Sequence, residues 1–163
     1  MSRAFIKEDS NDLEPLPDLP LSPHPNYVTP RGLAALHTRL AEAQTRLAAL
    51  RARPDRLDKL PEAAAERDIR YAEARLRTAL PVEPATQPQG AVAFGARVSV
   101  RDATGRNRSF EITGEDEADA TLGRIAPHAP LALALIGALV GDRVTWFKPS
   151  GTEDIEILAI SYD

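Results

Sequence analysis

The sequence predicts an α+β fold in which an antiparallel helical hairpin is followed by an antiparallel β-sheet that carries one helix. Residues 27–80 repeat leucine and alanine at intervals of three and four, the spacing of an apolar helix face. Residues 91–163 instead hold short segments of alternating apolar and polar residues between turns. Proline-rich stretches separate these parts. We therefore predict an extended Pro-rich acidic arm over 1–26, a coiled-coil hairpin over 27–80, a linker over 81–90 and a β-rich domain over 91–163.

The first 26 residues show no helix or strand pattern. They contain five prolines, and their two basic and five acidic side chains give a net charge of −3. This composition is typical of an extended, mobile arm, because a chain with many prolines and few apolar residues cannot bury a core. Arg3–Lys7 is the part of the arm with an apolar anchor. It either binds a partner surface or belongs to a disordered terminus.

The first predicted helix begins after Thr29. The Thr29 hydroxyl is a good N-cap, and Pro30 suits the first helical position because its missing N–H would be unpaired there. Arg53–Pro54 ends the helix, since the residue before a proline is driven out of the α region. Between these signals runs a heptad seam, which consists of Leu33, Leu36, Leu40, Ala43, Leu47 and Leu50.

A second helix begins at Pro61 and repeats the seam with smaller residues. The two helical arms, about 24 residues (30–53) and 20 residues (61–80), match in length and are joined by a short linker. An antiparallel hairpin is the natural product, with large side chains facing small ones. The second seam consists of Ala65, Ile69, Ala72, Leu76 and Ala79.

The β-rich part holds four predicted strands and one helix. Ala129–Leu131 opens the helix, because Pro130 is accepted in a first turn. Residues 102–106 and Pro149–Thr152 are read as turns between strands. The strands are expected within 94–101, 109–113, 144–147 and 155–162.

Composition and charge exclude several classes of protein. A chain without cysteine has no disulfide or thiolate metal site. No apolar run approaches the roughly 20 residues of a membrane span, and no signal peptide is recognisable, so we expect a cytoplasmic protein. The net charge is −4, yet residues 27–80 carry eleven basic and seven acidic side chains, while both ends are acidic. Such segregated charge suits contact with another protein better than duplex-DNA binding, which needs a concentrated positive face.

Conventional active-site patterns are scarce. The histidines His24, His37 and His128 lie far apart without metal-ligand spacing, and they are expected at the surface. No nucleophile elbow, Walker loop or dinucleotide fingerprint occurs. The acidic segment Glu115–Asp119 lacks the spaced ligands of a calcium loop, so it is read as a solvated loop or as an acidic patch facing a partner. We therefore predict no catalytic residue and no metal site.

The hairpin tip is where chemistry is plausible. Asp55, Asp58 and Glu62 would stand at the far end of a rigid rod. One or two of these carboxylates could hold Mg²⁺ and leave its other positions to water and phosphates. Arg56 and Lys59 lie among the acids and would oppose metal binding. The alternative is an ordinary solvated turn.

The β-rich part resembles the C-terminal domain of the GreA/GreB family of bacterial transcription factors. The resemblance extends in order over about 70 residues, and it includes Gly114, Glu117–Asp119, Leu135–Gly137 and Gly141–Val144. It implies an FKBP-like fold that binds the rim of the secondary channel of RNA polymerase. The polymerase-binding residues that it implies are Ala129, Pro130 and Leu131.

The resemblance also implies a role for the hairpin. In the family, a coiled coil enters the channel toward the catalytic Mg²⁺ of the polymerase, and tip acids help to position a second metal ion and a water, so that the polymerase cleaves backtracked RNA. The protein would then be no enzyme itself but would act on the activity of RNA polymerase. It would need no cofactor beyond Mg²⁺ at the polymerase active site, and its contact with nascent RNA would be indirect.

The hairpin departs from the family pattern in two respects. Asp58–Glu66 lacks the asparagine of the family's Asp-Leu-x-Glu-Asn-Ala-Glu-Tyr motif, and the hairpin looks shorter by roughly two turns per arm, or ~12 Å of reach. The protein therefore either stimulates cleavage or occupies the channel without cleavage, like Rnk-like regulators. An alternative of another class is an FKBP-like peptidyl-prolyl isomerase, whose proline pocket would have to come from Phe94, Phe110, Trp146, Phe147 and Tyr162.

Overall fold

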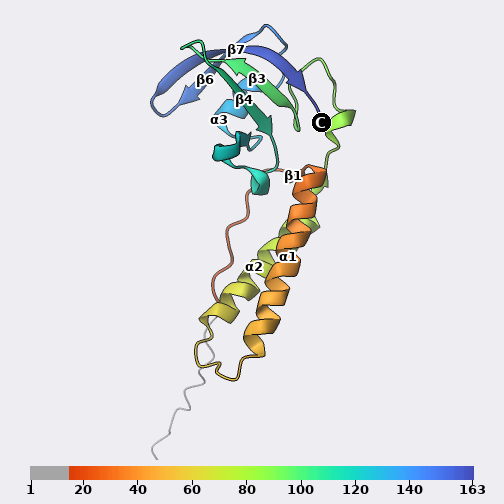
Figure 1. The fold of residues 1–163 in the computed structure, drawn as a ribbon, viewed down its shortest axis with the longest axis vertical. Helices are drawn as coiled ribbons and strands as arrows, with labels where there is room; N and C mark the ends of the chain where they lie inside the picture. Colours follow the sequence, from red (N-terminus) through yellow and green to blue (C-terminus); the bar gives the residue numbers. More distant parts are fainter. Residues whose placement is uncertain (1–14) are drawn as a thin grey trace, which may run out of the picture.

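The computed structural model describes residues 15–163, and it shows two long helices that form a rod with a curled sheet at one end (Figure 1). The predicted α+β class and the order of hairpin and sheet are confirmed. The segment Arg3–Lys7 lies outside the described residues. The helices are α1 (Pro30–Arg51), α2 (Leu60–Thr78) and α3 (Pro130–Leu135), and the strands are β1 (Tyr27–Val28), β2 (Leu80–Pro81), β3 (Arg97–Arg101), β4 (Asn107–Ile112), β5 (Arg124–Ile125), β6 (Arg143–Lys148) and β7 (Gly151–Ser161).

Helices α1 and α2 pack side by side in opposite directions (Figure 1). The Thr29 Oγ1 accepts a hydrogen bond from the Gly32 N–H at 3.0 Å, which confirms the predicted N-cap. Helix α1 ends at Arg51, two residues before the predicted stop. No helix within residues 15–163 is both long and apolar enough to cross a membrane. The most deeply buried residues of the hairpin seam are Leu36, Ala43 and Leu47 on α1, and Ala65 and Ala72 on α2.

A two-stranded parallel sheet closes the base of the hairpin. Strand β1 precedes α1 and strand β2 follows α2, and Tyr27 pairs with Leu80. The Val82 N–H donates to the Val28 carbonyl at 2.9 Å. The first residues of the predicted linker are therefore hydrogen-bonded to the base of the hairpin. Sequence reasoning missed this sheet, because strands of two residues carry no periodicity.

The C-terminal sheet has the strand order β5-β4-β3-β7-β6. Its pairs are antiparallel except for the parallel pair β4–β5, and the four predicted strands are present. The two-residue strand β5 was not predicted. The register shifts between Ser99 and Val100, where β3 meets β7. This irregularity accompanies the curl seen in Figure 1, because an extra residue in one strand bends and twists it.

The core of this domain lies between the inner face of the sheet and α3. Helix α3 packs against β6, and Leu135 of α3 is fully buried. Phe94, Val144 and Tyr162 are partly buried against this core. Among the buried residues contributed by the sheet are Val98, Val100, Phe110, Ile112, Ile155 and Ile157.

Candidate functional site

At the hairpin tip, Glu62 is held by an ion pair and does not face solvent. The Arg56 Nε and Nη2 donate to the two Glu62 carboxylate oxygens, each at 2.8 Å, and Lys59 Nζ lies 3.7 Å away. The hydrogen bonds from Arg56 lower the pKa of Glu62 to about 2. Only 8% of the Glu62 side chain is exposed. Glu62 stays a candidate for a metal ligand only, and the cations expected to oppose a metal are bound to it.

The other two predicted tip carboxylates shape the turn. Asp55 Oδ1 accepts the Leu57 N–H at 3.1 Å, and Asp58 Oδ1 accepts the Leu60 N–H at 3.0 Å. Asparagine and aspartate side chains commonly stabilise turns in this way. Leu57 is 90% exposed and Leu60 is 55% exposed, so the tip also presents apolar surface that sequence reasoning did not single out. No group of three potential metal ligands occurs within residues 15–163.

The acidic segment Glu115–Asp119 is neither a solvated loop nor a partner-facing patch, since it clasps the hairpin. Asp116 Oδ2 lies 2.6 Å from the Nε of Arg75, whose side chain is only 3% exposed. Asp116 Oδ1 accepts the Tyr71 hydroxyl at 2.6 Å. Burial and this hydrogen bond raise the pKa of Tyr71 to about 12. The sheet domain is thus fixed to α2 by a largely desolvated ion pair.

Glu117 makes the corresponding contacts with α1. Its Oε1 accepts the Thr29 hydroxyl at 2.7 Å and the Arg31 Nε–H at 3.1 Å. A Cβ on Gly32 would lie 2.2 Å from Glu117 Oε2, so glycine is needed here for the carboxylate to approach the helix. We call these contacts of Asp116 and Glu117 with the two helices the clasp.

The described part of the arm, residues 15–26, is bound to the rest of the molecule. Asp18 Oδ1 lies 2.6 Å from Arg70 Nε on α2, and Ser22 donates to Glu115 at 2.7 Å. The rings of His24 and His128 stack with their centres 4.2 Å apart. In Figure 1 this segment runs along the hairpin from its base. These residues are extended, as expected, and polar side chains hold them against the hairpin and the sheet domain at several points, which the sequence did not indicate.

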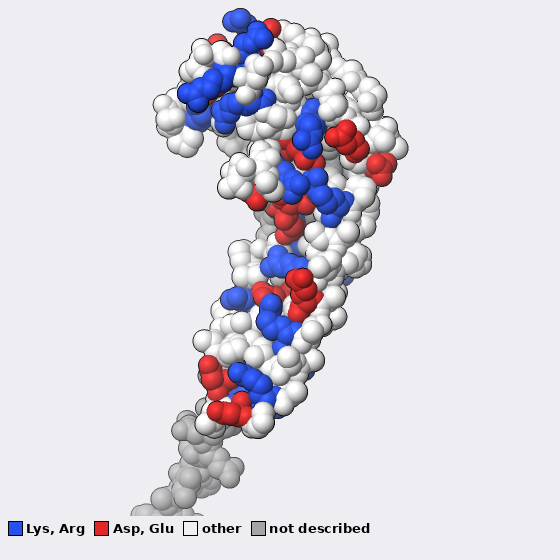
Figure 2. All heavy atoms as spheres, viewed as in Figure 1, with Lys and Arg blue, Asp and Glu red and all other residues white. Residues whose placement is uncertain are grey.

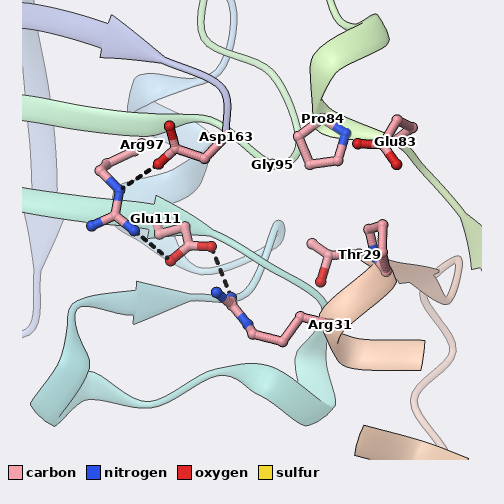
Figure 3. A pocket seen from close by; sticks show the side chains of 9 residues that line it. Thr29, Arg31, Glu83, Pro84, Gly95, Arg97, Glu111 and Asp163 are labelled. Carbon is pink, nitrogen blue, oxygen red and sulfur yellow. Dashed lines mark hydrogen bonds and ion pairs between the residues drawn. The ribbon is translucent and has the colours of Figure 1, made fainter. Parts of the chain in front are cut away.

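A cavity of about 320 Å³ lies where α1 meets the sheet (Figure 3). Glu111 lies between two guanidinium groups, 2.8 Å from Arg31 Nη2 and 3.5 Å from Arg97 Nη2. Asp163 lies 3.6 Å from Arg97 Nε. The charged side chains that line the cavity thus pair largely with one another. Their arrangement contains no nucleophile beside a base, and it serves as a further ionic contact between hairpin and sheet.

The predicted docking residues do not share one environment. Pro130 is exposed, Ala129 is half-buried and Leu131 is 3% exposed within the core. The assignment of Leu131 as a contact residue needs correction, because its side chain holds α3 to the sheet. Other apolar side chains at α3 and just after it face outward. This α3 surface consists of Leu133 (65% exposed), Ile136 (43%), Leu139 (51%) and Val140 (57%).

The five aromatic residues considered for a proline pocket are engaged in contacts with the core or lie exposed, and they do not line a common cavity among those found in the described residues. Phe94 contacts Tyr27 at a ring distance of 5.7 Å, and Phe110 meets Trp146 edge to face at 6.2 Å. Phe147 is 66% exposed. The Tyr162 hydroxyl bonds to the backbone of residues 91 and 93. No observation on the described residues therefore favours an isomerase site.

Comparison with known proteins agrees with the resemblance. Residues 87–162 match the family model for the C-terminal domain of transcription elongation factor GreA/GreB. Transcription elongation factor GreA of Thioalkalivibrio sulfidiphilus is 42% identical over 96 residues, which are 58% of this chain and 61% of that protein. Transcription elongation factor GreB of Neisseria meningitidis is 39% identical over 98 residues, or 60% of each. The chain thus spans about three fifths of the length of the curated relatives that it matches.

Similar solved structures include GreA factor homolog 1 of Thermus thermophilus, with 24% identity, a TM-score of 0.41 and coverage of 85% of this chain and 99% of that one. Another is the elongation factor GreA/GreB from Nitrosomonas europaea, with 20% identity, a TM-score of 0.42 and coverage of 84% and 99%. The similarity thus rests on the sequence matches to the family model and to the curated relatives: residues 87–162 match the C-terminal domain of the GreA/GreB transcription elongation factors.

Proposed function

We propose that the protein binds RNA polymerase through its C-terminal domain and modulates transcription elongation by placing its hairpin in the secondary channel. The α3 surface carries this proposal. It presents four apolar side chains, each more than two fifths exposed, beside the exposed Pro130 of a GreA/GreB-type domain. Large apolar side chains exposed within one short segment are candidates for a protein interface.

The clasp supports the second half of the proposal. A hairpin can be directed into a channel only if it keeps its orientation to the domain that docks. Arg75 with Asp116, and Thr29 with Glu117, connect both helices to the same short segment of the sheet domain. The hairpin and the docking domain would therefore approach the polymerase as one body.

The contacts of the tip residues favour a protein that occupies the polymerase channel over one that stimulates RNA cleavage. Glu62 is bound to Arg56 and Lys59, and Asp55 and Asp58 each use an oxygen to hold the turn. The chain's own carboxylates are thus poorly placed to bring in a metal ion. The protein would act without catalytic residues, in the cytoplasm where the polymerase works, and any Mg²⁺ would belong to the polymerase.

Binding of core RNA polymerase to the immobilised protein tests the docking surface. Leu133→Asp and Leu139→Asp should each weaken binding by about tenfold or more, the effect of losing an apolar anchor. Both side chains are more than half exposed, so the variants should keep their helical circular dichroism. Leu21→Asp is the matched control, because Leu21 is 53% exposed but lies on the arm. Equal binding by all three variants and the wild type would place the docking site elsewhere.

A further inference from the structure

Two aromatic rings and two cations from separate strands meet on the inner face of the curled sheet. Arg108 and Phe110 share one face of β4, and Trp146 and Lys148 share one face of β6, because side chains two residues apart point the same way. The guanidinium carbon of Arg108 lies 4.9 Å from the Phe110 ring centre and 5.4 Å from that of Trp146. Lys148 Nζ lies 4.9 Å from the Trp146 ring centre.

This cluster exists only because the sheet curls. Strands β4 and β6 are separated by β3 and β7 in the strand order, yet Phe110 and Trp146 touch edge to face. Trp146 is half-buried and Arg108 is exposed. The ring is therefore partly accessible from solvent, with cations placed over it.

Two arginines at this end of the sheet are left without an acidic partner in the described part of the chain. Arg106 and Arg108 have no carboxylate within 4 Å among residues 15–163. Lys148 pairs with Glu153. Asp102, near Glu153, is occupied by its own turn, since Oδ1 accepts the N–H groups of residues 104 and 106 at 2.9 and 3.0 Å. Figure 2 shows Lys and Arg side chains gathered over this end of the C-terminal domain.

We propose that this cluster binds single-stranded nucleic acid. Arg106, Arg108 and Lys148 would contact successive phosphates, and in moving toward them Arg108 and Lys148 would leave the Trp146 ring open for a base to stack on it. Aromatic rings beside cations are the common means of holding a single strand, because every base offers a π-face and every nucleotide a phosphate. A duplex hides its base faces, and residues 91–163 as a whole carry seven basic and eleven acidic side chains, so duplex DNA would not be favoured. An acidic peptide would leave the ring without a partner.

Trp146 is the only tryptophan in the chain, so its fluorescence reports on this site without a label. A short oligouridylate or oligodeoxythymidylate added to the wild-type protein should quench it. The logarithm of the binding constant should fall against that of the salt concentration with a slope of about −2, from three phosphate contacts at ~0.7 each. Quenching by both probes, or by the RNA alone, supports the proposal and assigns the strand type.

Three variants sharpen the test. Arg108→Gln should weaken binding by about tenfold, on the scale of one stacked contact. Arg77→Gln on α2, another arginine without an acidic partner within 4 Å in the part of the chain that the structure describes, should bind like the wild type. Trp146→Phe, followed by polarisation of a labelled oligonucleotide, should weaken binding and keep the fold.

The proposal is overturned if neither single strand quenches at low salt, or if Arg77→Gln loses as much affinity as Arg108→Gln. It is also overturned if a duplex or an oligoglutamate peptide binds more tightly than the single strands. No polymerase is present in this test, so its result is independent of the docking experiment.

Discussion

Replacing Asp116 by alanine should loosen the joint between the hairpin and the sheet. Arg75 is 3% exposed and Asp116 14% exposed, and their Nε and Oδ2 atoms are 2.6 Å apart. Removing one partner of a buried pair leaves an uncompensated charge, which costs about 3–5 kcal/mol. Glu115 lies 3.8 Å from Arg75 Nη2 and offsets part of the loss. We therefore expect the free energy of unfolding to fall by about 3 kcal/mol, the lower end of that range.

Two signals can follow the two parts of the molecule during thermal unfolding. Far-ultraviolet circular dichroism reports mainly on the hairpin, and the fluorescence of Trp146 reports on the sheet. In the wild type, the two transitions should coincide. Asp116→Ala should lower the midpoint of the helical signal by about 6–12 °C, at 2–4 °C per kcal/mol for a chain of this size. The fluorescence midpoint should move less, because the sheet keeps its own core.

Asp68→Ala is the matched control. It breaks the Arg46–Asp68 pair, which has a distance of 2.8 Å but side chains that are 51% and 28% exposed. An exposed pair of this kind contributes about 0–1 kcal/mol. Tyr71→Phe should be non-additive with Asp116→Ala, since both remove the same 2.6 Å hydrogen bond. If Asp116→Ala lowers the midpoint no more than Asp68→Ala, the buried pair does not hold the joint.

Three further predictions concern the tip and the clasp. Carboxyl carbon NMR should show a Glu62 pKa of about 2, and Arg56→Gln should move it back toward its ordinary value, because the Arg56 hydrogen bonds lower it. Since this pKa is depressed in the folded state, the pair stabilises the tip above the unfolded pKa, and that stabilisation is lost as pH falls toward about 2; an unshifted wild-type value would contradict the ion pair. Changing Asp55, Asp58 and Glu62 together to alanine should leave the effect on elongation unchanged, as measured by transcript length from a stalled, backtracked complex. If the wild type shortens the RNA and the triple variant does not, the tip is a true functional site. Gly32→Ala should destabilise the protein by about 1–3 kcal/mol in calorimetry, because the new Cβ would displace the Glu117 carboxylate, whereas Ala34→Ser on the exposed side of α1 should change it little.

The hairpin and the four long strands follow from the sequence alone, because the signals that determine them are local. Thr29–Pro30 starts α1 through contacts within one turn, and the spacing of Leu36, Ala43 and Leu47 selects one helix face whatever lies opposite. The alternation of apolar and polar residues along β3 and β4, and the turn between these strands, likewise depend on residues that are close together in the sequence. The elements that were missed, β1, β2 and β5, are two residues long and form only where another strand is already in place.

The sequence indicated which part of the chain holds the candidate docking residues, but it did not indicate which of these residues are exposed. Pro130 and Leu131 are neighbours in sequence, yet one faces solvent and the other the core. Burial depends on how α3 packs against β6, which no local pattern specifies. The same packing turns Leu133 and Leu139 outward and creates the α3 surface.

The acids show most clearly what tertiary structure decides. In sequence, Glu115–Asp119 is a run of acids with no basic residue among them, whereas Asp55, Asp58 and Glu62 alternate with Arg56 and Lys59. The fold brings Asp116 to Arg75, 41 positions away, and Glu117 to Thr29, 88 positions away. Glu62 is paired locally by Arg56 and Lys59, but the pairing of Asp116 and Glu117 depends on such distant contacts, because their partners are the groups that the packing of helices and strands places beside them. The sequence alone thus determined the helices and the four longer strands, while the fold determined which of their charges hold the molecule together and which remain for a partner.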